Sequence, residues 1–275
     1  MAKNAIVEMM VLLCVLLCST SCKKGSDAGP LPNPNDSIPV LPGWTLVWHD
    51  EFVGPAVDRT RWSYEVNGDG GGNNELQYYT DSPKNSFIDS GTLVLRALEE
   101  DYIGKHYTSA RMRTLNKGDW TYGRFEIRAK LPYGQGLWPA IWMLPSDWEY
   151  GGWPQSGEID IMEMLGHETT KVYGTIHYGL PPPNNQRSGG SYVLPVGTFA
   201  GGFHTFALEW DSNGMKWSVD GVLYRTELRG QPFDKRFHML LNVAVGGNWP
   251  GSPDASTTFP QMMVVDYVRV FQKPQ

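Results

Sequence analysis

Polar and apolar residues alternate along much of the chain after residue 43. The clearest run is 124–131, in which every second residue is apolar, as expected of a strand with one buried face. Three further strands are predicted at 92–98, 203–210 and 264–271. No window of eleven or more residues keeps a helical period without an interrupting glycine or proline. The pattern therefore predicts strands joined by turns.

Two dipeptides in the C-terminal third mark tight turns. Asn213-Gly214 and Asp220-Gly221 flank a short predicted strand at 215–219, and another follows at 222–224. Both dipeptides favour hairpins because the central turn positions need positive φ. Many short strands at regular spacing predict an all-β fold, an antiparallel β-sandwich with six or seven strands in each sheet. Residues 180–193, rich in Pro, Gly and Asn, predict a loop.

The first 42 residues differ in kind from the rest. Residues 9–18 form an apolar run that is too short to span a bilayer and is typical of a signal peptide. Small residues before Cys22 resemble a bacterial lipoprotein cleavage site, which predicts a lipoprotein-type signal peptide at 1–22 with lipid on Cys22. Residues 23–42 contain five prolines and predict a flexible tether. The folded domain is predicted to span 43–275.

Three interpretations of this N-terminal region stay open, and each of them exports the protein. The first is a lipoprotein anchored to a bacterial outer membrane or cell surface. The second is a secreted protein with an ordinary cleaved signal, and the third retains the segment as an anchor.

Composition narrows the function classes further. There are 23 Lys and Arg residues against 29 Asp and Glu, a net charge of −6, which argues against nucleic-acid binding and leaves the lipid anchor as the expected membrane contact. The three cysteines, Cys14, Cys18 and Cys22, exclude a disulfide framework or thiol nucleophile in the folded part. Eleven Trp and 31 Gly predict an aromatic-lined cleft. Nothing predicts an obligate partner, so a monomer is expected.

The segment 157–165 concentrates acidic residues within an apolar strand. Glu158 and Asp160 share one face, because side chains alternate along a strand. Strict alternation would bury Glu163 without a partner, at a high cost in free energy. One extra residue near Ile161 and Met162, a β-bulge, returns Glu163 to the acidic face. The sequence therefore predicts three acids on one face with a bulge between the second and third.

Three neighbouring carboxyl groups cannot all ionise freely. Their repulsion separates their pKa values, so that one group stays protonated while another is charged. Glycoside hydrolysis with retention of configuration needs such a pair, roughly 5–5.5 Å apart. A metal-binding acidic edge and a solvated strand face are the alternatives.

Several motifs, in the same order along 44–272, resemble glycoside hydrolase family 16, and the residue before Glu163 resembles its laminarinase-like branch. The resemblance implies a jelly-roll sandwich with a concave substrate cleft and endo-hydrolysis of β-1,3-glucans with retention. It rests on residues 48–52, 73–79, 136–145, 157–163, 174–177, 242–251 and 265–270.

The resemblance also implies roles for the acids. Glu158 would be the nucleophile that forms a glycosyl ester, and Glu163 would be the acid and then the base. Asp160 would hydrogen-bond to one or both and tune their pKa values. No cofactor is expected for catalysis.

Several other residues are candidate substrate contacts. Trp138 and Trp142 lie four apart in an extended segment and so share a face, where indoles stack on sugar rings or pack in the core. The resemblance favours the cleft for both, and for Trp249 in a Gly/Pro-framed loop. His177 is expected to contact substrate or Glu163.

Asn74 and Arg111 are candidate binders of sugar hydroxyls. Arg111 has the alternative of a salt-bridged surface residue. The resemblance further implies a structural calcium ion bound by backbone oxygens of Glu51 and Gly91 and by the carboxylate of Asp266. The alternative for Asp266 is an ion pair without metal.

These observations predict a retaining endo-β-1,3-glucanase that acts on laminarin-like glucans, with mixed-linkage β-1,3-1,4-glucan as a second substrate. A family 16 galactanase of the agarase or carrageenase kind is one alternative, and a transglycosylase is another. A non-catalytic glucan-binding lectin on the same fold is the alternative from a different class, disfavoured because both Glu158 and Glu163 are present.

Overall fold

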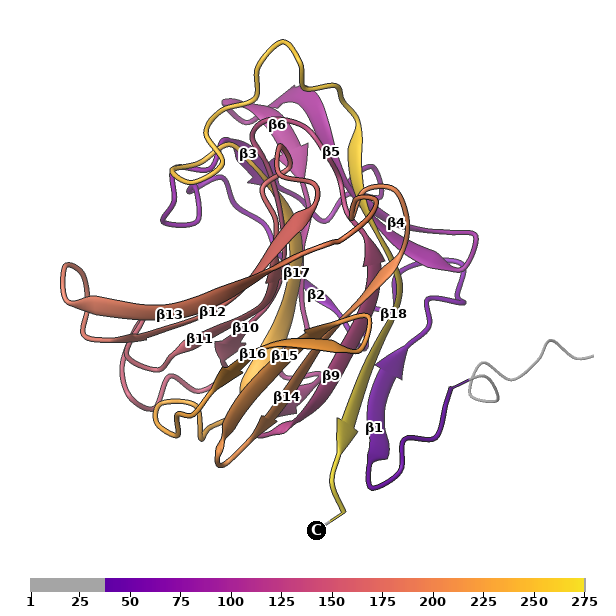
Figure 1. Cartoon of the computed structure of the whole chain (residues 1–275). Helices are drawn as coiled ribbons and strands as arrows, with labels where there is room; N and C mark the ends of the chain where they lie inside the picture. The colour runs from indigo at the N-terminus through magenta and orange to yellow at the C-terminus, as the bar shows by residue number, and fades with distance from the viewer. Residues whose placement is uncertain (1–37, 275) are drawn as a thin grey trace, which may run out of the picture. The chain divides into compact units, whose positions relative to one another are not determined.

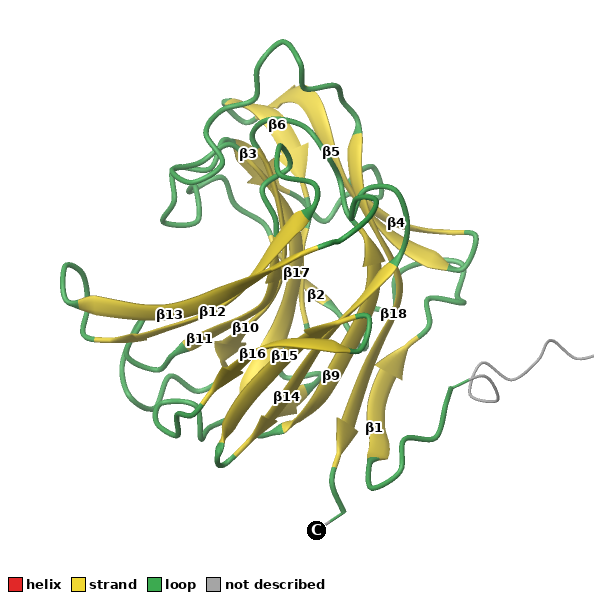
Figure 2. Cartoon of the chain, viewed as in Figure 1, coloured by secondary structure: helices red, strands yellow, loops and turns green. Residues whose placement is uncertain are grey.

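A computed structural model describes residues 38–274 of the chain. The predicted signal peptide at 1–22, its lipidation site Cys22 and most of the tether at 23–42 lie outside the described residues. Between residues 38 and 274 every regular element is a strand, as Figures 1 and 2 show. In that part of the chain no helix is long and apolar enough to cross a membrane.

The strands form two sheets, which confirms the predicted all-β sandwich, although both sheets are larger than the expected six or seven strands. The ten-stranded sheet follows the order β16-β15-β14-β9-β18-β5-β6-β3, with β1 paired to β18 and β4 to β5. Its strands are β1 (Thr45–Asp50), β3 (Gln77–Tyr79), β4 (Ser86–Asp89), β5 (Thr92–Tyr102), β6 (Lys105–Ser109), β9 (Gly123–Lys130), β14 (His204–Asp211), β15 (Gly214–Val219), β16 (Val222–Glu227) and β18 (Gln261–Gln272).

The eight-stranded sheet carries the acidic segment near its middle. Its order is β13-β12-β11-β10-β17-β7-β2, with β8 paired to β17. Its strands are β2 (Ser63–Glu65), β7 (Arg111–Arg113), β8 (Asp119–Trp120), β10 (Leu137–Pro145), β11 (Glu158–Glu163), β12 (Lys171–Gly179), β13 (Asn185–Val193) and β17 (Phe237–Val245).

The core lies between the two sheets. Along β9 the buried positions alternate as the sequence predicts, with Phe125, Ile127 and Ala129 pointing inward. All nine residues of β17 are buried, which matches its apolar sequence and its central place in the sheet. Each fully buried large side chain stabilises the fold by about 1.5–3 kcal/mol relative to an exposed one. The core therefore gives the acidic strand a rigid support.

The two predicted hairpins are present, but they use their glycines differently. Asp220 and Gly221 are the central turn residues, with φ of 50° and 79°. The other hairpin pairs Asp211 with Gly214, so its turn residues are Ser212 and Asn213. A Cβ on Gly214 would lie 2.0 Å from the carbonyl oxygen of Glu227. The glycine is needed there for close approach of two strands rather than for the turn.

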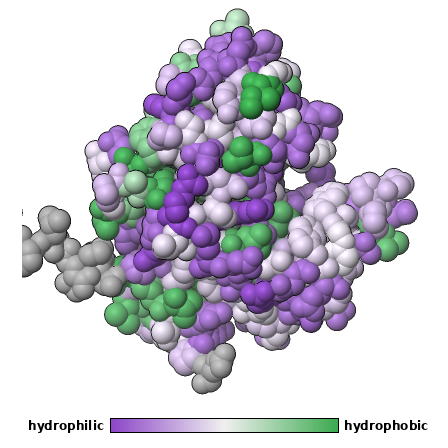
Figure 3. Space-filling model, turned by 180° about the vertical axis from the view of Figure 1, so that it is seen from behind, coloured by the Kyte–Doolittle hydropathy of each residue, from purple (hydrophilic) through white to green (hydrophobic). Residues whose placement is uncertain are grey.

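The predicted loop at 180–193 is wrong, because most of it is the edge strand β13. This strand pairs with β12 along its whole length, with Lys171 opposite Val193 at one end and Gly179 opposite Asn185 at the other. Its side chains are largely exposed, so it lacks the apolar pattern that marks a strand in the sequence. The two strands form an arm that projects from the domain in Figure 1. Seen from behind, the arm is pale, in keeping with its Gly and Ser residues (Figure 3).

Candidate active site

The predicted bulge is present in β11. On one side Asp160 pairs with Trp142 and Met162 with Ile141, which leaves Ile161 as the extra residue. On the other side the register with β12 also shifts between Asp160 and Glu163. Because of this extra residue all three acids line the same cleft. The reasoning that a Glu would not be left in the core is therefore confirmed.

Glu158 and Glu163 each accept a hydrogen bond from an indole. Trp153 Nε1 donates to Glu158 Oε2 at 2.8 Å, and Trp138 Nε1 donates to Glu163 Oε1 at 3.1 Å. The Glu158 side chain retains 16% exposure, whereas Glu163 is buried. Glu158 thus has the greater access to water in the cleft.

Asp160 lies between these two acids along β11, and His177 faces Glu158 and Asp160 from β12. Asp160 Oδ2 has no hydrogen-bond partner among the described residues, so it does not make the predicted bond to either glutamate. His177 Nε2 is 3.4 Å from Asp160 Oδ2 and 3.8 Å from Glu158 Oε1. His177 therefore contacts the first two acids rather than Glu163, because the strand register places it directly opposite Glu158. Since His177 lines the cleft, the predicted contact with substrate stays a prediction.

Burial dominates the electrostatics of the acids. It raises the pKa of Glu158 to about 8, with the charge of Asp160 adding to the shift and His177 opposing it. Burial also raises the pKa of Glu163 well above its usual range, and the charges of Asp160 and Glu158 add to it. Burial likewise raises the pKa of Asp160, with Arg225 opposing. The cluster therefore holds protons near neutral pH.

The acids lie in a cleft of about 1120 Å³ on the outer face of the eight-stranded sheet. Trp138, Trp142 and Trp249 all line it, as predicted. The Trp249 ring lies edge-on to Trp138 at 5.5 Å and to Tyr173 at 5.0 Å. Apolar ring faces beside buried acids are the surfaces that a sugar chain needs. The β12–β13 arm adds one wall, which includes Arg187.

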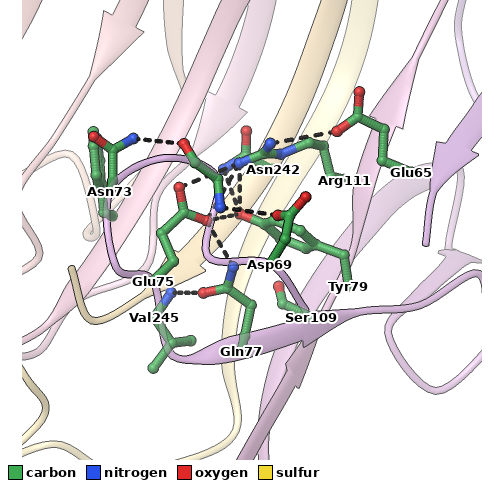
Figure 4. Close-up of polar contacts among 12 residues, drawn as sticks. Glu65, Asp69, Asn73, Glu75, Gln77, Tyr79, Ser109, Arg111, Asn242 and Val245 are labelled. Carbon is green, nitrogen blue, oxygen red and sulfur yellow. Dashed lines mark hydrogen bonds and ion pairs between the residues drawn. The ribbon is translucent and has the colours of Figure 1, made fainter. Parts of the chain in front are cut away.

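A buried polar network supports the other wall, and Figure 4 shows its members converging. Arg111 is buried, lines the cleft and donates to Glu75 and Tyr79 at 3.2–3.3 Å. The Tyr79 hydroxyl donates to Glu75 at 2.9 Å and accepts from Asn242 at 3.1 Å. Asn242 in turn accepts from Trp142 Nε1 at 2.7 Å. The network fixes the indole of Trp142 and places a cation at the cleft wall.

Arg111 is ion-paired, but it is buried rather than at the surface, and it lines the cleft. Its role as a binder of sugar hydroxyls stays a prediction. Asn74 does not line the cleft, because its exposed amide donates to Asn248 at 2.9 Å, whereas its neighbour Asn73 does. Glu75, Tyr79 and Tyr173 are site residues that the sequence does not predict. Glu75 and Tyr79 belong to the motif at 73–79, but no spacing in the sequence shows that they meet Arg111.

The strand register brings the predicted calcium ligands to one junction of the ten-stranded sheet. Along one edge, β18 pairs first with β5, and the last pair is Val265 with Leu93. The same edge then pairs with β1, and the first pair is Val268 with Asp50. Asp266 lies in the gap between these pairings, beside the turn that contains Gly91 and the residue after β1, Glu51. Backbone and carboxylate oxygens are the kinds of ligand that a calcium ion takes. Arg128 also donates to Asp266 Oδ2 at 2.5 Å, so an ion would share this carboxylate with an arginine.

Comparisons with known proteins agree with this geometry. The sequence profile of "Glycosyl hydrolases family 16" matches residues 72–269. A beta-glucanase of Rhodothermus marinus is 45% identical over 86% of this chain and 88% of its own length. A glucan endo-1,3-beta-glucosidase of Cryptopygus antarcticus is 44% identical over 76% of this chain and 83% of its own.

A solved structure gives the same result. The catalytic domain of an endo-1,3-beta-glucanase (laminarinase) from Thermotoga petrophila superposes with a TM-score of 0.79 at 45% identity, covering 84% of this chain and 99% of that domain.

Proposed function

The chain belongs to glycoside hydrolase family 16, and from this premise we propose that it cleaves internal β-1,3 bonds of laminarin-like glucans with retention of configuration. The observation that carries the proposal is the bulged strand β11. It presents Glu158 and Glu163 to one cleft, with Glu158 partly exposed to water and Glu163 buried. Mixed-linkage β-1,3-1,4-glucan is the second candidate substrate.

In the first step Glu163 acts as the acid. Its protonated carboxyl gives a proton to the glycosidic oxygen while Glu158, in the molecules in which it is ionised, attacks the anomeric carbon as a carboxylate. The charge of His177 and the hydrogen bond from Trp153 favour that ionised form. The bond to the leaving sugar breaks, and a glycosyl ester forms on Glu158. Glu163 suits this role because its pKa is raised well above its usual range.

In the second step the roles reverse. The Glu163 carboxylate accepts a proton from water, the water oxygen attacks the anomeric carbon, and Glu158 leaves as a carboxylate. The Trp153 indole at 2.8 Å and the neighbouring His177 stabilise that carboxylate. Capture of the ester by a second sugar would give transglycosylation instead. The steps need only these carboxyl groups, sugar and water.

Asp160 adjusts both partners. When it is ionised, Asp160 raises the pKa values of Glu158 and Glu163, which favours the protonated Glu163 of the first step and opposes ionisation of Glu158. Trp138, Trp142 and Trp249 offer ring faces to the glucan on the same cleft surface. A calcium ion at Glu51, Gly91 and Asp266 would hold β1 and β5 together along β18, away from the chemistry.

We further propose that the chain works outside the cytoplasm as a monomer. The apolar run at 9–18 and Cys22 support export with a lipid anchor, and the prolines at 23–42 support a tether.

The test is reducing-end release by the full-length chain from laminarin, lichenan, curdlan and agarose, with Glu158→Gln in parallel. Release from laminarin and curdlan that disappears in the variant is the expected result. Release from agarose alone would keep the chemistry and replace the substrate by a galactan. Laminarin binding without any release would indicate a lectin.

A further inference from the structure

The catalytic strand and its neighbour bring together three side chains that can bind a metal ion. Glu158 faces His177 across the β11–β12 pair, and Asp160 lies two residues further along. One carboxylate oxygen of each acid and one imidazole nitrogen lie within 4.8 Å of one another. Donors from two adjacent paired strands are held in a fixed geometry.

A second observation points to a cation at the same place. Asp160 is only 3% exposed, and its Oδ2 has no hydrogen-bond partner among the described residues. A buried carboxylate oxygen without a partner is costly in free energy. This same oxygen faces His177 Nε2 at 3.4 Å. A proton satisfies it while the carboxyl group is neutral, and a bound cation that displaces the proton would satisfy it as well.

Two of the distances between the ligand atoms are compatible with a zinc ion. Ligand atoms about 2.0–2.2 Å from a tetrahedral zinc ion lie about 3.3 Å from one another. The distance of 3.4 Å between His177 Nε2 and Asp160 Oδ2 matches this ligand-to-ligand spacing. The distance of 3.8 Å between His177 Nε2 and Glu158 Oε1 is longer, so one of these side chains would have to move by about 0.5 Å. One nitrogen and two carboxylates suit zinc, whereas magnesium and calcium need six or more oxygen ligands.

We propose that Glu158, Asp160 and His177 form a binding site for zinc, or a similar divalent transition metal, that reversibly blocks the enzyme. The metal would take the electron pair with which Glu158 attacks the sugar. Its fourth position would face the cleft, where the substrate lies. The inhibition rests on the proposed glucanase function, but the metal site itself does not.

Isothermal titration of the full-length chain with zinc chloride tests the site directly, with magnesium chloride as the control metal. We expect one zinc ion per chain and no binding of magnesium at this site. His177→Gln and Asp160→Asn should each weaken zinc affinity by at least ~10-fold, since each removes a ligand. Two variants are used so that the result does not depend on the folding of one.

His204 provides a matched control. Its Nδ1 lies 2.7 Å from Asp220 Oδ2, so it is also a histidine beside an aspartate, but it does not line the cleft. His204→Gln should therefore leave zinc affinity unchanged. A loss of affinity in this variant would place the zinc on the surface and overturn the proposal.

Laminarin hydrolysis at several zinc concentrations tests the inhibition. Zinc should raise KM without changing kcat, because metal and sugar compete for one site, and dialysis should restore activity. Zinc binding that the His177 and Asp160 variants do not weaken would refute the site. If the variants weaken zinc binding but the chain hydrolyses no glucan, the metal site stands and the proposed function is refuted. If the chain hydrolyses glucan but binds no zinc, the proposed function stands and the metal site is refuted.

Discussion

At the residue scale, the acids of β11 share one strand but differ in their surroundings. Each glutamate has an indole donor, but Glu158 also has a histidine nearby and some access to water, whereas Glu163 is buried beside two other carboxyl groups. Burial and repulsion both favour the protonated form of a carboxyl group. The same arrangement that prepares the cluster for catalysis should therefore cost stability.

This cost predicts how stability depends on pH. The native pKa of Glu158 is about 8, against about 4.3 in an unfolded chain. Between these values the native state holds more protons than the unfolded state, so this group lowers the free energy of unfolding as pH rises. Glu158→Gln keeps an acceptor for Trp153 and removes the charge. It should stabilise the protein by about 1–3 kcal/mol at pH 8 and very little at pH 4.

Thermal unfolding from pH 4 to pH 9 would measure the effect. Replacement of the exposed Glu99 by Gln is the control and should give no gain that grows with pH. A gain for Glu158→Gln that is the same at every pH would show that the charge of this carboxyl group is not the cause.

At the element scale, the sequence predicts a strand best where the strand buries one of its faces. The alternation at 124–131 predicts β9, and the cost of burying Glu163 predicts the bulge. Strand β13 escapes prediction because it is held by backbone pairing with β12 while its side chains remain exposed. The sequence does not predict the network around Arg111 for another reason. Glu75 and Asn242 come from distant segments that only the folded chain brings together.

The strand β12 leads to a prediction about packing behind the bulge. A Cβ on Gly174 would lie 2.5 Å from the Tyr224 hydroxyl and 2.6 Å from Trp217. Trp217 also donates to the carbonyl oxygen of Asp160 at 2.8 Å. Gly174→Ala should therefore destabilise the fold by about 1–3 kcal/mol and disturb the acidic strand.

Denaturant unfolding and laminarin hydrolysis should both respond to this substitution. Gly152→Ala is the matched control, because a Cβ there meets nothing within 4 Å. Equal stability of the two variants would mean that Tyr224 and Trp217 move aside at no cost.

At the scale of the whole molecule, the junction of β1, β5 and β18 decides how firmly the N-terminal strand is held. If calcium binds Asp266 at this junction, its removal should lower Tm by roughly 5–10 °C when the free ion is at about 100 times its Kd. Asp266→Asn should remove the calcium dependence. Thermal unfolding with chelator and with added calcium distinguishes this from an Asp266–Arg128 ion pair alone, for which Tm would not respond to calcium.

The N-terminal segment leads to the last prediction. If Cys22 carries lipid, the exported chain should sediment with membranes and enter the detergent phase on partitioning. Cys22→Ser should release the chain from both, because no other residue would bear the lipid, while specific activity on soluble laminarin stays the same. Mass spectrometry of the mature N-terminus gives an independent readout. A serine variant that stays in the membrane fraction would favour a retained anchor, and a wild-type chain found entirely in the medium would favour an ordinary cleaved signal.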